Sequence, residues 1–213
     1  MKSDIQKITE TDALKLLQSY QISLAPDRKV EVPWTMSQIE CGPILDAACG
    51  GGFLQQCLLD LGFEVFASDI HPDASIYYDK GPKRPNFMLW DARTCPPKSF
   101  INKFGTVLIV STIEHLDKGD DLKVLRQLCK CISLGGELII TCPYGNDDMR
   151  VLGVKAERYY SLERLVSIGA ILNLQHISHK IFTKEDQGWP WVNTPDAYTP
   201  WKDIICLKLK KIS

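Results

Sequence analysis

Short apolar runs alternate along this chain with segments of helical periodicity. Each run is continuous, as expected of a strand buried on both faces, and most end near a glycine or an acidic residue. Between the runs, apolar positions recur at the three- and four-residue spacing of one helix face. The predicted strands are Pro43–Ala48, Phe63–Ile70, Phe87–Trp90, Thr106–Ser111 and Glu137–Cys142, and the predicted helices are Ile8–Leu17, Phe53–Leu61 and Asp120–Ile132.

The alternation of strands and helices predicts a parallel sheet with helices on both faces. Gly135 and Gly136 follow the third predicted helix, and we expect them to end it before the fifth strand. The tail differs, because a predicted helix at Ser161–Ile168, capped by Ser161, is followed by two runs with no helix between them. We expect these runs, Leu174–Phe182 and Ile204–Leu209, to be antiparallel strands.

The chain shows neither an internal repeat nor a low-complexity linker, which favours one domain over residues 1–213. Residues 1–40 precede the first strand, and we expect them to form a helical segment on the substrate side of a core at 41–213. Hydrophobic residues make up 45% and charged residues 24%, the proportions of an ordinary globular protein.

The charge balance narrows the classes of partner. Lys plus Arg number 25 against 26 for Asp plus Glu, so the chain lacks the basic excess typical of nucleic-acid binding. Its amino terminus is polar, and no apolar run approaches the roughly 20 residues of a membrane span. We therefore expect a small-molecule partner, with neither nucleic acid nor a membrane. The sequence leaves the oligomeric state open, with a homodimer as one alternative.

Eight cysteines occur without a CxxC pair, and several lie inside apolar runs. Free cysteine behaves in this way when it serves as a small buried hydrophobe. Reduced thiols in the cytoplasm are the simplest interpretation, and we expect neither a disulfide framework nor a zinc site.

A glycine-rich loop, Cys49-Gly50-Gly51-Gly52, joins the first strand directly to a helix. Glycines at such a turn let the backbone approach a ligand closely. The dinucleotide fingerprint requires a third glycine where this chain has Gln55, and no lysine follows the loop as in a phosphate loop. Asp46 instead precedes the glycines, which favours a cationic or amine-bearing ligand over a pyrophosphate.

Three acidic residues stand at the ends of three successive predicted strands: Asp46, Asp69 and Asp91. Parallel strands present their carboxyl ends at one edge of a sheet, where ligands of such folds bind. An ionised carboxylate offers only acceptors, so Asp69 is suited to both hydroxyls of a ribose. Each acid alone is equally well explained as a helix or turn cap, but the three together with the loop favour a binding site.

These motifs resemble those of the class I S-adenosylmethionine (SAM)-dependent methyltransferases. DAACGGG is similar to the family's acid followed by Gly-x-Gly-x-Gly, with Ala48 in place of the first glycine. SDIHP, WDA, VLIVSTIEHL and LGGELIITCPYG follow in the family's order, so the resemblance covers residues 42–145. It implies a three-layer αβα sandwich with a seven-stranded, mostly parallel sheet of order 3-2-1-4-5-7-6 and an antiparallel last strand.

The resemblance also implies a cofactor site for SAM, which leaves as S-adenosylhomocysteine. Asp46 is then expected near the methionine amino group, Asp69 at the ribose, and Asp91 with the Ala92 backbone at the adenine. The further residues that we expect to contact the cofactor are Ala48, Cys49, Gly50, Gly52, Ile70, Ser111 and Thr112.

The segment after the fourth strand is where the family draws catalytic groups. His115 is the candidate base for a hydroxyl acceptor because imidazole titrates in a suitable range, and Glu114 is a candidate beside it. Alternatively, the Glu-His pair serves the cofactor or the loop shape. Some relatives hold a metal here, but this chain has Ser111 in place of one carboxylate, so we expect none. The segment lacks Asn-Pro-Pro-Tyr, which argues against adenine-N6 or glutamine-amide methylation.

The candidate substrate residues are aromatic: Tyr144, Tyr160, Trp189 and Trp191. The two tryptophans lie in a long loop, residues 185–201, and packing on the sheet edge is the alternative role for them. Our hypothesis is methyl transfer from SAM to a small molecule, with an oxygen of a sugar or secondary metabolite preferred. The alternatives are a non-catalytic binding subunit of the same fold and an NAD-dependent oxidoreductase.

Overall fold

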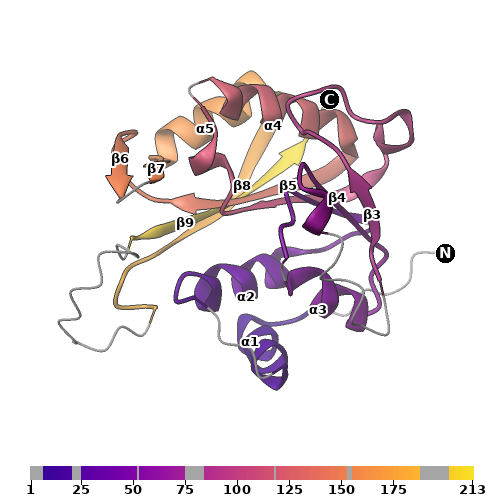
Figure 1. The fold of residues 1–213 in the computed structure, drawn as a ribbon, viewed down its shortest axis with the longest axis horizontal. Coiled ribbons are helices and arrows are strands. Elements are labelled where there is room, and N and C mark those ends of the chain that lie inside the picture. Colours follow the sequence, from indigo (N-terminus) through magenta and orange to yellow (C-terminus); the bar gives the residue numbers. More distant parts are fainter. Residues whose placement is uncertain are drawn as a thin grey trace.

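A computed structural model describes residues 7–20, 25–51, 53–74, 84–117, 119–152, 155–187 and 202–213. One twisted sheet of seven strands forms its centre, in the order β3-β2-β1-β4-β5-β9-β8 (Figure 1). The strands are β1 (Ile44–Ala47), β2 (Val65–Asp69), β3 (Asn86–Leu89), β4 (Phe104–Val110), β5 (Ile132–Pro143), β8 (Leu174–Phe182) and β9 (Ile204–Lys211).

The predicted sheet topology is confirmed. β1 to β5 pair in parallel, and β9 is antiparallel to both β5 and β8. Because β8 and β9 are the sixth and seventh strands of this sheet, the order is the expected 3-2-1-4-5-7-6. The predicted antiparallel pairing of the two terminal strands is correct, since β8 pairs with β9 from Leu174 opposite Lys211 to Phe182 opposite Ile204.

Helices cover both faces of the sheet, which confirms the three-layer sandwich. In Figure 1, α1 (Glu10–Ser19), α2 (Arg28–Gln38) and α3 (Leu54–Asp60) lie on one face. The other face carries α4 (Asp120–Cys131) and α5 (Leu162–Ile171). Ser161 caps α5 as predicted, its side chain accepting a hydrogen bond from the Arg164 amide. None of the helices in the described part of the chain is long and apolar enough to span a bilayer.

The strands contribute to two apolar cores because successive side chains point to opposite faces of the sheet. Ile44 and Ile139 pack beneath α1 to α3, whereas Leu45 and Leu138 pack beneath α4 and α5. The cysteines take part as expected: all eight are free, and Cys57, Cys131, Cys142 and Cys206 are buried.

The two glycines after α4 do not separate the helix from the strand, so that prediction was wrong. β5 begins at Ile132, immediately after α4, and runs through Gly135 and Gly136. A Cβ on Gly136 would lie 2.9 Å from the Gly105 carbonyl oxygen of β4. The glycine therefore permits a close approach of two strands at a point where their register shifts.

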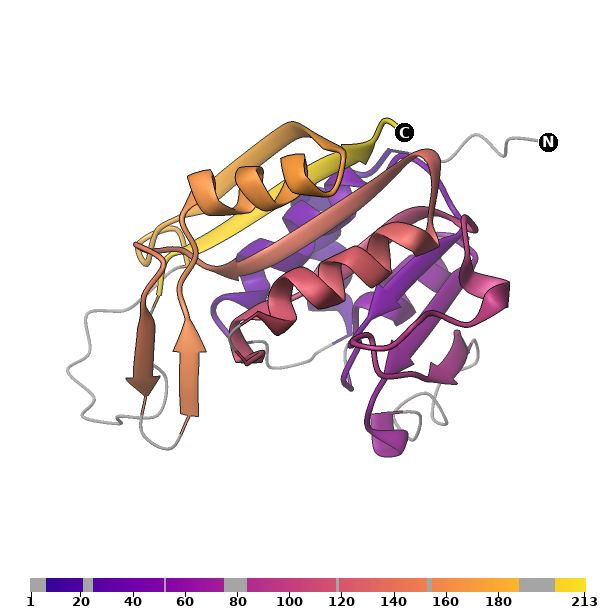
Figure 2. The ribbon, with the colours of Figure 1, turned by 90° about the horizontal axis from the view of Figure 1, so that it is seen from above.

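Two further elements were not predicted. Helix α2 contains Pro33, which interrupts the helical pattern in the sequence although most of the helix is buried. Strands β6 (Met149–Leu152) and β7 (Lys155–Arg158) form a separate antiparallel ribbon after β5. Figure 2 shows that this ribbon projects beyond the sheet at the end where β5 finishes. Arg28 and Val32 of α2 line the site described below, and the ribbon packs against the 3-10 turn Ile113–His115 beside it.

Candidate functional site

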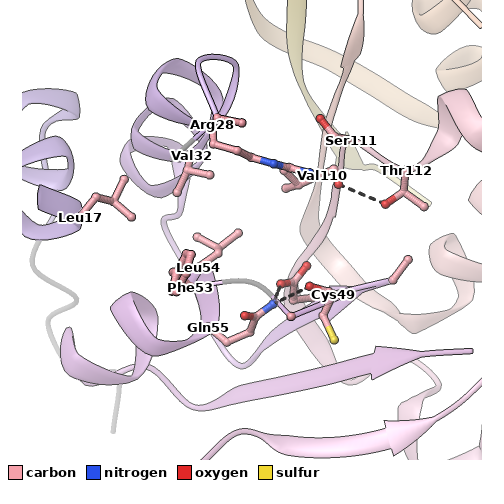
Figure 3. Close-up of a pocket in the computed structure, with 15 residues that line it drawn as sticks. Leu17, Arg28, Val32, Cys49, Phe53, Leu54, Gln55, Val110, Ser111 and Thr112 are labelled. Atoms are coloured by element: carbon pink, nitrogen blue, oxygen red, sulfur yellow. Dashed lines mark hydrogen bonds between the residues drawn. The ribbon is translucent and has the colours of Figure 1, made fainter. Parts of the chain in front are cut away.

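Two adjoining cavities lie at the carboxyl ends of β1 and β4, where the strand order of the sheet reverses. The first, of about 460 Å³, is bounded by the glycine loop, α2 and α3 (Figure 3). The second, of about 380 Å³, is bounded by the ends of β2 and β3 and by the segment after β4. Both are lined by Ala48, Ser111 and Thr112, so they form one crevice at the position where open α/β sheets bind ligands.

Two residues shared by both cavities have left-handed backbone conformations although neither is glycine. Ala48 has φ 54° and Ser111 has φ 43°. Such residues raise the free energy of the fold by about 1 kcal/mol or more and concentrate at functional sites. Alanine at position 48 therefore adopts a conformation that suits the glycine of the motif, with the smallest possible side chain.

Asp46 lies at the floor of the first cavity and is 3% exposed. Burial raises its pKa to about 7, although a hydrogen bond from the Gln55 side chain acts in the opposite direction. Gln55 occupies the position of the missing dinucleotide glycine, and Figure 3 shows its amide turned to this carboxylate. A cation in this cavity would favour the ionised form of Asp46.

Asp69 fixes the glycine loop and also faces the second cavity. Its two carboxylate oxygens accept backbone N–H groups, one from Gly50 at 2.9 Å and the other from His71 at 2.9 Å. A carboxylate oxygen accepts more than one hydrogen bond, so each retains acceptor capacity for a ligand. The loop and the acid at the end of β2 thus form one unit.

Asp91 lines the same cavity beside Ala92 and Ile70. Its carboxylate is paired with Arg93, whose Nε and Nη2 atoms each approach it to 2.9 Å. That hydrogen bonding lowers the pKa of Asp91. The predicted residues at the ends of β1, β2 and β3, together with Cys49, Ser111 and Thr112, are all brought to this crevice. Gly52 lies outside the described residues.

Helix α2 adds a cation and an acid that sequence reasoning missed. Arg28 reaches across the first cavity toward Ser111 (Figure 3), and its Nη1 lies 2.6 Å from Glu31. Burial lowers the pKa of Arg28, but the charges of Glu31, Asp27 and Glu114 together outweigh it and the net shift is upward. Glu31 is fully buried and also accepts from Ser111 at 2.8 Å and Thr141 at 2.6 Å. α2 is thereby fastened to the ends of β4 and β5.

Glu114 and His115 belong to a short 3-10 turn after β4, Ile113–His115. His115 is about half exposed and lines the second cavity. Glu114 is buried, and its carboxylate oxygens have no hydrogen-bond partner among the described side chains. Burial raises the pKa of Glu114 to about 8, so it is mostly a neutral acid at pH 7. Its Oε1 lies 3.9 Å from Nε2 of His115.

Tyr160 is placed in the core, which corrects its prediction as a substrate residue. It is 0% exposed, and its hydroxyl donates to the Ile113 carbonyl at 3.1 Å beneath the turn. A side chain with no exposed surface supports the turn but does not touch a substrate. Tyr144 is half-buried and bridges to Tyr160 through the backbone, and it is not among the residues lining the crevice. Trp189 and Trp191 lie outside the described residues.

Comparison with known proteins gives a family model and a set of solved structures. Residues 45–140 match the family model described as a methyltransferase domain. No curated protein matches the chain in sequence. The 1,6-didemethyltoxoflavin-N1-methyltransferase of Burkholderia thailandensis, with S-adenosylhomocysteine bound, is 14% identical with a TM-score of 0.65, over 100% of this chain and 94% of that one.

Two other solved structures extend the comparison. The glycopeptide N-methyltransferase MtfA, in complex with SAM, is 17% identical over 85% of this chain and 86% of its own, with a TM-score of 0.64. The [4+2]-cyclase SpnF is 16% identical over 79% of this chain and 74% of its own, with a TM-score of 0.60. At these identities the similarity establishes the fold, and the matched family model covers the segment from β1 into β5.

Proposed function

We infer that this chain, a class I SAM-dependent methyltransferase, transfers the methyl group of SAM to a hydroxyl oxygen of a small molecule, such as a sugar or another secondary metabolite. The methyltransferase domain over residues 45–140 sets aside the alternative of a nicotinamide-dependent oxidoreductase. The observation that carries the proposal is the composition of the crevice, which has paired charges at one end, a diol-binding acid at the other and His115 beside the second cavity.

The polar groups of the crevice fit SAM end to end. In the first cavity, Arg28 suits the carboxylate and Asp46 the ammonium group of the methionine part. In the second, Asp69 suits the ribose hydroxyls, and the Ala92 backbone with the Ile70 side chain suits the adenine. SAM supplies a methyl group activated on a positively charged sulfur. The acceptor atom attacks the methyl carbon in line, and the sulfur is the leaving group.

The chain's own residues supply orientation and proton removal. Leu17 and Val32, from α1 and α2, line the first cavity with apolar surface and so limit water there. His115 takes the proton from the acceptor hydroxyl as the new oxygen–carbon bond forms. Glu114, as a neutral acid beside the imidazole, adds no negative charge next to the base at neutral pH.

A nitrogen acceptor is the second candidate. Two of the solved relatives are named as N-methyltransferases, one of them acting on a glycopeptide. A neutral amine attacks without prior loss of a proton, so this reaction depends less on a base than the hydroxyl reaction does. A role without methyl transfer is the third candidate, because SpnF carries the same fold under the name of a cyclase.

A panel of acceptors separates these three candidates. We expect SAM labelled in its methyl group to transfer label to sugar and phenolic hydroxyls, with the methylated atom identified by NMR of the product. Label on nitrogen alone would replace the hydroxyl proposal by the amine one. SAM binding measured by calorimetry without transfer to any member of the panel would favour the non-catalytic role.

Gly50→Val is expected to weaken SAM binding by about tenfold, because valine strains a left-handed backbone by roughly 1–2 kcal/mol. Gly50 has φ +53°, and its N–H holds Asp69, so a shift of the loop also displaces that acid. Gly62→Val is the matched control, since Gly62 has φ +88° and lies after α3, away from the crevice. Calorimetry with SAM should show the loss in the first variant only, and equal losses in both would contradict a specific role of the loop.

A further inference from the structure

His115 has a second acidic neighbour, supplied by the ribbon that follows β5. Oε1 of Glu157, on β7, lies 3.9 Å from Nδ1 of His115, whereas Oε1 of Glu114 lies 3.9 Å from Nε2. β7 packs against the 3-10 turn that carries the histidine. The ribbon therefore brings a carboxylate to Nδ1 of His115, while Glu114 lies beside Nε2.

Glu157 is itself held in place by a lysine. Its Oε2 lies 2.7 Å from Nζ of Lys202, just before β9, and both side chains are nearly buried, at 12% and 13% exposed. A carboxylate and an ammonium group at this distance form an ion pair. The Lys202 ammonium group thus contacts the Glu157 carboxylate, which in turn lies beside the imidazole of His115.

The two acids beside His115 differ in what they offer the ring. Glu157 is an anion and only accepts hydrogen bonds, whereas Glu114 is neutral at pH 7 and keeps its own proton. An anion next to Nδ1 holds the ring proton on that nitrogen and leaves Nε2 with the free electron pair. The present 3.9 Å is longer than a hydrogen bond, and contacts of this kind shorten when substrates bind.

We propose that Glu157 is a positioning residue, whose carboxylate, oriented by Lys202, fixes the tautomer and direction of the His115 imidazole. The inference rests on the proposed function in that it gives His115 the role of base. It assigns the β6–β7 ribbon a part in the site: the ribbon carries the group that makes Nε2 the proton acceptor.

The charged groups around His115 determine the direction of the expected effects. Glu114 faces it from its own turn, Glu157 from β7, and Lys202 stands behind Glu157. Arg28 and Glu31, from α2, act on Glu114. Removing the negative charge of Glu157 disfavours the imidazolium, so the ring should lose its proton at lower pH; removing the positive charge of Lys202 should do the opposite.

NMR titration of the full chain, labelled with ¹³C and ¹⁵N in its histidines, tests this without an acceptor. The chain has four histidines, and His115→Asn identifies the relevant signal. Glu157→Gln should move the midpoint of the His115 titration down by about one pH unit, and Lys202→Met should move it up. Glu163→Gln is the control, because Glu163 is an exposed acid in α5. The ¹⁵N shifts should report the proton on Nδ1 in the parent protein and a mixture of tautomers in Glu157→Gln.

The two variants carry opposite predicted signs, so a general loosening of the fold does not imitate the result. An unchanged midpoint and tautomer in Glu157→Gln, or shifts of the same sign in both variants, overturns the inference. Once a methyl acceptor has been identified, kcat gives a second test. Glu157→Gln should lower kcat about tenfold when His115 is present and leave kcat unchanged when it is introduced into the His115→Ala variant.

These experiments distinguish a failure of the proposed function from a failure of the positioning role of Glu157. If the titration shifts as expected but His115→Ala is fully active, the proposed function fails and Glu157 still orients the ring. If His115→Ala loses activity while the titration and tautomer stay unchanged in Glu157→Gln, the positioning role of Glu157 alone is wrong.

Discussion

Replacing Asp69 by alanine is expected to weaken SAM binding by about 30- to 1,000-fold. In the role proposed for Asp69, the variant removes two charge-assisted hydrogen bonds to the ribose hydroxyls, worth roughly 2–4 kcal/mol together. It also removes the acceptor of the Gly50 and His71 amides, both at 2.9 Å, so the glycine loop loses its anchor. This double role places the effect toward the upper end of the range.

Calorimetry with SAM measures this loss, and Asp73→Ala is the matched control. Asp73 is an exposed acid four positions further along the chain, so its removal changes the net charge equally. Asp69→Asn separates the two roles, since the amide keeps one acceptor oxygen but loses the charge. We expect it to bind SAM more weakly than the parent and more tightly than the alanine variant. An unchanged dissociation constant in Asp69→Ala would refute the ribose assignment.

The cofactor side of the crevice was predictable from sequence because its residues follow strand ends. Asp46, Asp69 and Asp91 lie at or near the ends of three apolar runs, and parallel strands bring such ends to one edge. The direct contact between Gly50 and Asp69 joins residues only 19 positions apart. Local periodicity and the rules of parallel sheets were sufficient to bring these residues to one edge, whereas their assignment to SAM came from the family resemblance.

The part of the crevice formed by helix α2 was not predictable in this way. Glu31 is bonded to Ser111 and Thr141, which lie 80 and 110 positions away, and no local pattern marks that relation. Pro33 further masked α2, because a proline in a helix interior removes one hydrogen bond and argues against the helix. Packing of nearly the whole helix against the sheet overrides that local preference.

A glycine in the sequence can mark either a left-handed backbone or a position with no space for a side chain, and both occur in this chain. At Gly50 the left-handed backbone makes the loop, as the sequence suggested. At Gly136 the decisive factor is space, since the neighbouring strand leaves no room for a Cβ. A sequence does not distinguish these causes, which is why the start of β5 was placed five residues too late, at Glu137 in place of Ile132.

Residues suited to the cofactor and residues placed near the candidate base come from different parts of the fold. Most of the groups suited to SAM lie at the ends of β1 to β4, within the matched family segment 45–140, and α2 adds Arg28 from before that segment. Glu157 and Lys202 come from segments after it. One fold serves many reactions through the residues that it carries, so the fold does not specify the acceptor. The acceptor must be identified from these later segments and by experiment.

His115→Ala should lower kcat for a hydroxyl acceptor by about 10²- to 10⁴-fold, the usual contribution of a general base. Its effect on SAM affinity should be small, because the groups that suit SAM lie on other residues of the crevice. His176→Ala is the control, since His176 lies on β8 in the part of the sheet away from the crevice.

The pH dependence gives the sharper test of this base. In the parent, kcat should rise with pH as the imidazole loses its proton, and this limb should be absent from the residual activity of His115→Ala. Steady-state kinetics with labelled SAM across pH 5–9 measure both effects. A variant that keeps full kcat and the same pH limb would show that another group removes the proton. A fall in SAM affinity that accounts for the whole loss would assign His115 to cofactor binding, as its place in the second cavity also permits.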